Sequence, residues 1–292
     1  MSREGASLWR VRVVVDPGGA NLQTLVEEIR PPEPPPSLDA AARFLPDGAY
    51  TTFRTYQHNK TISLESHFHR LEETATLAGH SLNVDREMLR KTLRKVISTY
   101  SASLELRLRV LIDLEIEIGA IYLAAEPLHA LAAEAYKDGV KLITCNFERP
   151  NPKAKLTTTM SGVDVLRHNL PPDVNEALMV NEKGFILEGI SSNFFAVIAG
   201  RVLTAEEGVL SGITRQVVLE EAQRAGLTIC LKSVLIAELP TVQEAFITSA
   251  SRAVLPVRQV DEQIIGVGNP GPVTRLLAQR YSDRILGEAE PI

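Results

Sequence analysis

Four stretches of the 292-residue sequence carry residue types that can do chemistry. The first is DGAYTTFR at 47–54 with HFHRL at 67–71, and the second is RPNPKAK at 149–155. The third is GFILEGISSNFF at 184–195 with VLSGITR at 209–215, and the fourth is EAFITSASRAVLPV at 244–257. A neutral lysine amine is a nucleophile, and a carboxylate inside an apolar run needs a cationic partner.

The second and third stretches allow more than one interpretation. Lys153 and Lys155, taken alone, would be solvated surface lysines, and Glu188 could be a strand-end carboxylate facing water. Ile213 and Thr214 follow a glycine where a helix is expected to begin. Unpaired N–H groups and the positive end of the helix dipole favour an anion at such a position.

Other functional patterns are weak or absent. Residues 266–271 match G-x-G-x-x-G, but only 21 residues follow and Pro270 removes a backbone donor, so we expect a turn and not a dinucleotide site. The sequence has no H-E-x-x-H, no cysteine pair at ligand spacing and no G-x-S-x-G. His67 and His69 are expected to be structural, and no metal site is predicted.

Composition points to a globular cytoplasmic protein. The net charge is −5, and acids and bases are mixed along the chain, so neither a nucleic-acid nor a membrane-surface partner is predicted. No stretch reaches the roughly 18 apolar residues of a membrane span, and the N-terminus lacks the layout of a signal peptide. Cys145 and Cys230 are expected to be buried free thiols.

Hydrophobic periodicity predicts the elements of the N-terminal half. Strands are expected at 8–15, 50–56 and 61–64, and amphipathic helices at 66–78 and 85–100. Residues 104–118 alternate apolar and polar side chains, which indicates strand with a hidden turn. The proline-rich residues 31–36 predict a surface loop or arm.

The remaining residues indicate a mixed α+β (α/β) protein with two domains. The smaller N-terminal domain is expected at 1–125, an alanine-rich connection at 126–137, and a larger C-terminal domain at 138–292, to which the resemblance described below assigns cofactor binding. Strands are expected at 140–146, 177–180, 185–187 and 194–198. Helices should begin at Ile213 and near Pro272.

The order, spacing and residue identities of the four stretches resemble those of the class IV, or fold type IV, pyridoxal-phosphate aminotransferases. That family includes branched-chain aminotransferases, D-amino-acid aminotransferases and 4-amino-4-deoxychorismate lyase. The resemblance covers roughly residues 45–282, and its most specific part is LEGISSNFF with LSGITR about twenty residues later. It implies a two-domain fold type IV architecture, pyridoxal 5′-phosphate as cofactor and a homodimer.

The resemblance assigns the cofactor residues. Lys155 would hold the cofactor as an imine and shuttle the substrate proton, with Lys153 as the rival, and Glu188 would keep the ring nitrogen protonated. The residues implied around the phosphate are Arg70, Ile213, Thr214, Ser249, Ala250 and Ser251. Relatives often carry threonine where this chain has Ala250, and branched-chain relatives carry tyrosine where it has Met160.

The substrate residues are less well defined. Arg109 matches the family's cationic position better than Arg107, although a solvent-facing pair of arginines is also open. Thr51 with Thr52 resembles the lyase branch, and the absence of an Arg-x-His loop argues against D-amino acids.

The predicted function is transfer of an amino group between an amino acid, branched-chain among the options, and a 2-oxo acid. The alternatives are the pyruvate-eliminating lyase and a non-catalytic pyridoxal-phosphate-binding protein.

Overall fold

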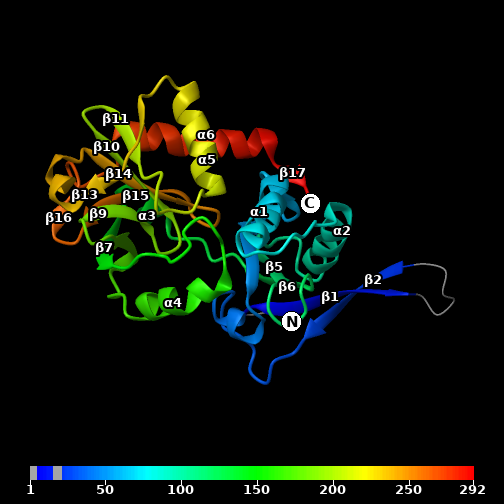
Figure 1. Cartoon of the computed structure of the whole chain (residues 1–292). Coiled ribbons are helices and arrows are strands. Elements are labelled where there is room, and N and C mark those ends of the chain that lie inside the picture. The colour runs from blue at the N-terminus through cyan, green and yellow to red at the C-terminus, as the bar shows by residue number, and fades with distance from the viewer. Residues whose placement is uncertain (1–4, 16–21) are drawn as a thin grey trace. The chain divides into compact units, whose positions relative to one another are not determined.

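The computed structural model describes residues 5–15 and 22–292 (Figure 1). Contacts among its Cα atoms divide the chain into two compact units. The first unit consists of Met1–His129, Ala154–Met160 and Glu288–Ile292, and the second of Ala130–Lys153 and Ser161–Gly287. The division after His129 falls inside the expected connection. The expected boundaries put residues 154–160 and 288–292 in the C-terminal domain, whereas the contacts assign both segments to the first unit.

The first unit is built on a five-stranded antiparallel sheet in the order β2-β1-β6-β5-β3. The strands are β1 (Ser7–Val15), β2 (Leu22–Ile29), β3 (Gly48–Arg54), β5 (Leu106–Asp113) and β6 (Ile121–Pro127). The strands expected at 8–15 and 50–56 are confirmed. Strand β2 has no counterpart among the expected elements, because the described side chains of LQTLVEEI are largely exposed on both faces.

The alternating stretch at 104–118 contains the end of a strand. Strand β5 ends at Asp113, a buried residue whose carboxylate accepts the N–H groups of Glu115, Ile116 and Glu117 at 2.8–2.9 Å. Aspartate stabilises turns in this way because its side chain replaces the ladder partners of the backbone. The polar and apolar residues after Asp113 therefore alternate in a turn, not in a strand.

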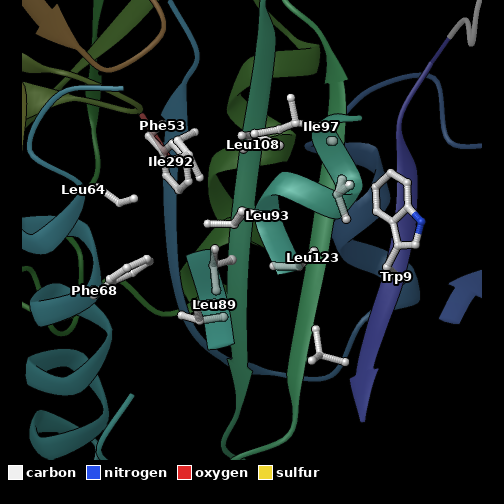
Figure 2. Packing of buried hydrophobic residues seen from close by; sticks show 14 of the residues in the cluster. Trp9, Phe53, Leu64, Phe68, Leu89, Leu93, Ile97, Leu108, Leu123 and Ile292 are labelled. Carbon is white, nitrogen blue, oxygen red and sulfur yellow. The ribbon is translucent and has the colours of Figure 1, made fainter. Parts of the chain in front are cut away.

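Two helices cover one face of this sheet, as Figure 2 shows. They are α1 (Leu64–Leu77) and α2 (Arg86–Ile97), and the Asp85 carboxylate caps α2 by accepting the Met88 N–H at 2.9 Å. Their apolar stripes pack on the sheet in one core that also contains Ile292, which is 1% exposed. Next to Ile292, β17 (Glu290–Pro291) pairs with β4 (Lys60–Thr61).

The second unit is built on a ten-stranded mixed sheet. The strand order is β12-β11-β10-β14-β15-β7-β8-β9-β13, with β16 paired to β15. The strands are β7 (Val140–Asn146), β8 (Val174–Val180), β9 (Phe185–Gly189), β10 (Asn193–Ile198), β11 (Arg201–Thr204), β12 (Ile229–Leu231), β13 (Val234–Leu235), β14 (Glu244–Ser249), β15 (Ala253–Val260) and β16 (Gln263–Ile264). The expected strands at 140–146, 177–180, 185–187 and 194–198 all lie within this sheet.

The helices are α3 (Ala133–Asp138), α4 (Met160–His168), α5 (Ile213–Arg224) and α6 (Pro272–Glu288). Helices α5 and α6 begin at the predicted residues. The expectation of two buried cysteines is wrong, because Cys145 and Cys230 are only half-buried. No helix in the described part of the chain is long and apolar enough to cross a membrane.

The G-x-G-x-x-G stretch leads into α6, as expected. The buried carboxylate of Glu244 accepts the N–H groups of Val273 and Thr274 at 3.1 and 2.7 Å. A Cβ atom on Gly271 would lie 2.0 Å from Glu244 Cδ, so any other residue at this position would displace the carboxylate. The helix start already holds an anion of the protein's own, which leaves no place for a nucleotide phosphate.

Candidate active site

Lys155 lies on a segment that extends the sheet of the first unit beyond β3. The Tyr50 N–H donates to the Lys155 carbonyl at 3.0 Å, and Ala49 forms an antiparallel bridge with Leu156. The Lys155 N–H donates to Thr74 Oγ1 of α1 at 3.3 Å. The backbone of Lys155 is therefore fixed to a strand and to a helix at the same time.

Asp47 and Gly48 of the first motif hold the same segment at η2 (Thr157–Thr159), which begins two residues after Lys155. The Gly48 N–H donates to Thr157 Oγ1 at 2.8 Å, and that hydroxyl donates to Asp47 Oδ1 at 2.7 Å. Gly48 has no room for a side chain, because a Cβ atom would lie 2.0 Å from the Ile112 carbonyl oxygen. Asp47 and Gly48 thus position the lysine segment.

The Lys155 side chain is half-buried, and its Nζ lies 4.7 Å from the centroid of the Tyr50 ring. An aromatic face attracts an amine in its charged form and holds the side chain in one direction. Lys153, the rival, is exposed. This difference favours Lys155 as the cofactor lysine.

Thr51 points to the opposite face of β3 from Tyr50. Its hydroxyl is fully buried and lies 2.7 Å from Nδ1 of the buried His67. Burial first, and then the charges of Arg70 and Lys155, keep the His67 pKa well below its usual value. This placement differs from the expected substrate contact of Thr51, because the hydroxyl is bound to a core histidine. Arg70, the expected phosphate residue, is half-buried on α1.

Arg107 and Arg109 share one face of β5, but they do not form a solvent-facing pair. Arg109 is 3% exposed, and its guanidinium donates to Asp39 Oδ1 at 2.6 Å and to the Leu38 carbonyl at 2.9 Å. Its Nε donates to Thr52 Oγ1 at 3.2 Å. A substrate carboxylate, the expected partner of Arg109, would therefore have to compete with the Asp39 carboxylate for the guanidinium.

Arg107 belongs to the same charged cluster. It donates to both oxygens of Asp39 at 3.0 Å and to Glu126 Oε1 at 2.9 Å. Burial alone would lower the Arg107 pKa, but the charges of Asp39 and Glu126 outweigh it and raise the pKa. The charge of Arg107 is thus compensated by the protein itself, and a substrate role for this residue stays a prediction.

Glu188 lies at the end of β9 in the second unit and is 2% exposed, so the alternative of a solvent-facing glutamate is wrong. The cationic partner that its apolar surroundings require within this unit is Arg149, whose Nε lies 3.1 Å from Glu188 Oε1. Its Oε2 accepts from Asn193 Nδ2 at 3.0 Å and from the Leu210 N–H at 3.1 Å. Donors and charge of this kind favour the ionised carboxylate.

The start of α5 is open to an anion. Gly212 precedes the helix, and no side chain among the described residues caps it. The Gln216 N–H closes the first turn onto the Gly212 carbonyl at 2.9 Å. Thr214 is buried and Ile213 half-buried, both in the first turn, where backbone N–H groups point out of the helix. This geometry suits the phosphate role that the resemblance gives to both residues.

The loop after β14 carries Ser249, Ala250 and Ser251, all half-buried. Ser249 Oγ accepts from the Arg252 N–H at 3.3 Å and from Arg252 Nε at 3.2 Å. Arg252 also donates to the buried Glu176 at 3.1 Å. Ser249 is thus held by the loop itself, although its hydroxyl hydrogen can still be donated.

Glu176 ties the LEGISSN motif to this loop. Its carboxylate accepts from the N–H and hydroxyl of Ser191, both at 2.6 Å, and from the Ser192 hydroxyl at 2.5 Å. Burial would raise the Glu176 pKa, but the Arg252 charge and the serine hydroxyls outweigh it and lower the pKa. The serines of the motif therefore build the loop around Glu188.

Sequence reasoning missed several of these residues. Asn193 and Arg149 stand inside the quoted motifs, but nothing in the sequence pairs them with Glu188. Thr248 is 2% exposed, faces Asn193 across the β10–β14 ladder, and its Oγ1 has no hydrogen-bond partner among the described residues. The hydroxyl-bearing residues at 248–251 were the available signal, but the prediction named Ser249, Ala250 and Ser251 and not Thr248.

Comparisons with known proteins decide the family. Residues 48–260 match the family model described as amino-transferase class IV. The chain belongs to the class IV aminotransferases. A branched-chain-amino-acid aminotransferase of Pseudomonas aeruginosa is 26% identical over 263 residues, covering 83% of this chain and 85% of that protein. A D-alanine aminotransferase of Bacillus licheniformis is 27% identical over 267 residues, covering 83% and 89%.

Solved structures agree with the predicted fold type IV architecture. The branched-chain amino acid aminotransferase of Escherichia coli superposes with a TM-score of 0.72 at 23% identity, over 86% of this chain and 89% of that chain. This likeness concerns the fold. The cofactor of class IV aminotransferases is pyridoxal phosphate, as the motifs predicted.

The described residues fit this cofactor. It requires an amine, a carboxylate for the ring nitrogen and donors for a phosphate of nearly two charges. Lys155 supplies an amine in a fixed direction, Glu188 a buried charged carboxylate, and Thr214 the uncapped helix start. The hydroxyl of Thr248, buried without a partner among the described residues, is a further polar group that a ligand could satisfy.

Proposed function

We propose that this class IV aminotransferase moves an amino group between an amino acid with an aliphatic side chain and a 2-oxo acid, with Lys155 as the cofactor lysine. The observation that carries the proposal is the fixed backbone of Lys155 and the direction of its amine over Tyr50. When bound, pyridoxal phosphate supplies an electron sink that makes the proton on the substrate's α-carbon acidic.

In this proposal the protein's residues move the proton and hold the charges. The Lys155 amine takes the proton from the α-carbon of the donor amino acid and returns a proton to the α-carbon of the acceptor 2-oxo acid. Glu188 keeps the proton on the ring nitrogen, because Arg149, Asn193 and the Leu210 N–H stabilise its ionised form. Thr214 and the N–H groups of the first turn of α5 hold the phosphate, together with Arg70.

The neutral state of His67 fits this arrangement. Because its pKa is well below the usual value, the imidazole adds no positive charge near Lys155 at neutral pH. Like charges within a few ångströms disfavour each other, and an amine must lose its own proton before it can act as a base. A neutral histidine therefore leaves the control of the Lys155 charge to other groups.

The test compares Lys155→Ala with the matched control Lys153→Ala. We expect wild-type protein and Lys153→Ala to bind pyridoxal phosphate with a visible absorbance band. Borohydride should abolish this band and make the attachment of the cofactor irreversible. Peptide mapping should then find the label on Lys155, and Lys155→Ala should lose both label and turnover. Label on Lys153, or full turnover by Lys155→Ala, would contradict the assignment.

The reaction itself is identified by its products. Leucine with pyruvate as acceptor should give the keto acid of leucine, and pyruvate should become alanine. Pyruvate released from 4-amino-4-deoxychorismate without an acceptor would indicate the lyase instead. A coloured protein that forms neither product would be a non-catalytic binder, and the proposed transaminase would be wrong.

We further propose that the protein acts as a homodimer, which the family resemblance supports. Sedimentation equilibrium should give twice the 32.0 kDa mass of the chain. A single species at the mass of one chain, across micromolar concentrations, would contradict this.

A further inference from the structure

The pair formed by Arg109 and Asp39 has no part in the proposed chemistry. Arg109 is 3% exposed, and its Nη2 lies 2.6 Å from Asp39 Oδ1. A buried cation without a partner is strongly destabilising, whereas a hydrogen-bonded carboxylate compensates its charge. Asp39 is therefore the group that allows a cation to be buried at this position.

Arg109 lies close to the cofactor lysine. Its guanidinium carbon is 5.0 Å from the centroid of the Tyr50 ring, and Lys155 Nζ is 4.7 Å from the same centroid. The guanidinium and the amine are therefore separated by no more than the sum of these two distances. A buried cation at this range of the amine is a group that would attract the second carboxylate of a dicarboxylic substrate.

The cluster around Arg109 is already balanced in charge. It contains two guanidinium groups, those of Arg107 and Arg109, and two carboxylates, those of Asp39 and Glu126. A substrate carboxylate that bound Arg109 would add a third anion to a cluster with two cations. Repulsion from Asp39 would oppose it, and Asp39 occupies the guanidinium edge that it would need.

The proline-rich segment holds Asp39 in place. The Ala6 N–H donates to the Pro35 carbonyl at 3.0 Å, and Leu38 is fully buried. The Leu38 N–H donates to Glu126 Oε2 at 2.6 Å, and the Leu38 carbonyl accepts from Arg109. Prolines restrict the backbone before this anchor, so Asp39 has little freedom to move aside.

We propose that Asp39 is a specificity-determining residue, which occupies Arg109 in place of a substrate carboxylate and so excludes dicarboxylic substrates. The preferred amino acid then has an uncharged side chain. This inference rests on the proposed transaminase function and names the class of its substrate.

The first test is a comparison of amino donors. Wild-type enzyme should have a higher kcat/KM for leucine than for glutamate, and Asp39→Asn should raise the glutamate-to-leucine ratio by about tenfold or more. Glu126→Gln is the matched control, because it removes a carboxylate from Arg107 and leaves the Asp39–Arg109 pair. Its ratio should stay at the wild-type value. A folded, active Asp39→Asn enzyme with the wild-type ratio would overturn the proposal, as would a wild-type preference for glutamate.

The second test does not need turnover. Glutarate, a dicarboxylate without an amine, should raise the melting temperature of cofactor-free Asp39→Asn and leave wild-type protein unchanged. The double variant Asp39→Asn/Arg109→Gln should lose this shift, because the cation is gone. An equal shift in wild type and Asp39→Asn, or a shift that persists in the double variant, would overturn the assignment of Arg109.

The double variant also keeps the test decisive where Asp39→Asn does not fold. It removes both charges together and so leaves no uncompensated cation. We expect its KM for leucine to stay close to that of wild type, whereas a large increase would mean that Arg109 anchors every substrate. If wild type has no transaminase activity, the proposed function fails, and the glutarate shift still tests Asp39 by itself.

Discussion

Helices α5 and α6 begin in the same way, yet only α5 is open to a ligand. Each follows a glycine whose carbonyl accepts the first helical hydrogen bond, from Gln216 in α5 and from Arg275 in α6. At α6 the Glu244 carboxylate binds the N–H groups of the first turn. At α5 no described side chain does so. The same local sequence signal thus gives a structural cap in one helix and an anion site in the other.

The two glycines exclude side chains for different reasons. A Cβ atom on Gly271 would lie 2.0 Å from Glu244 Cδ, and one on Gly212 would lie 2.0 Å from Asn193 Oδ1. Glu244 only caps a helix, whereas Asn193 donates to Glu188. A glycine before a helix is thus informative only through the side chain that fills the space beside it.

The largest effect is expected from Gly271→Ala. The methyl group would displace the buried Glu244 carboxylate from the helix start and leave both a charge and backbone donors unsatisfied, at a cost of about 3 kcal/mol in the free energy of unfolding. Urea denaturation of the cofactor-free protein measures this loss. The cofactor dissociation constant of the folded protein should not change, and a parallel loss of cofactor affinity would break the comparison.

Gly212→Ala is the matched change at α5. The methyl group would push Asn193 away from Glu188, and we expect cofactor affinity to fall by about 2 kcal/mol, roughly thirtyfold. Absorbance titration of the cofactor-free protein with pyridoxal phosphate measures the dissociation constant. The comparison fails if the variant loses stability as Gly271→Ala does while it binds the cofactor normally.

Thr214→Val removes one donor from the open helix start without a change of shape. We expect the dissociation constant for pyridoxal phosphate to rise about tenfold, since a hydrogen bond to a charged group contributes about 1.5 kcal/mol or more. Pyridoxal without its phosphate should bind both proteins equally. An equal loss for pyridoxal would mean that Thr214 does not act on the phosphate.

The smallest effect is expected from Thr274→Val at α6. Thr274 is fully buried, and its Oγ1 has no hydrogen-bond partner among the described residues. Replacement of a buried hydroxyl that has no partner should leave the free energy of unfolding within about 0.5 kcal/mol or raise it. A clear destabilisation in urea denaturation would show that this hydroxyl has a partner.

The elements could be predicted where the residue pattern is local. The period of α1, the glycine before α5 and Pro272 at the start of α6 place those helices correctly. Strand β2 escaped prediction because its described side chains are largely exposed and give an incomplete apolar pattern. The turn expected within residues 104–118 could not be placed, because the apolar alternation continues unchanged after Asp113. Tertiary contacts, not local propensity, determine those features.

The site could be predicted as a list of residues but not as contacts. Motif resemblance supplies Lys155, Glu188 and Thr214, because their spacing along the chain is specific. It assigns Arg109 to substrate, whereas its partner Asp39 lies 70 residues earlier in the chain, beside a proline run that had no predicted role. Pairing between residues so far apart depends on the order of the strands in the sheet, and this order cannot be determined from a single sequence.

The first unit is assembled from three separate stretches of chain, and this has a consequence for its synthesis. Ile292 lies in the core against α2, where its carbonyl accepts from Arg94 at 2.7 Å, and residues 154–160 complete the edge beside β3. A polypeptide cut after residue 129 would lack both pieces and expose the apolar surface that they cover. This unit therefore cannot complete its core during translation until residue 292 has been added, and the apolar surface around that position is exposed to aggregation until then.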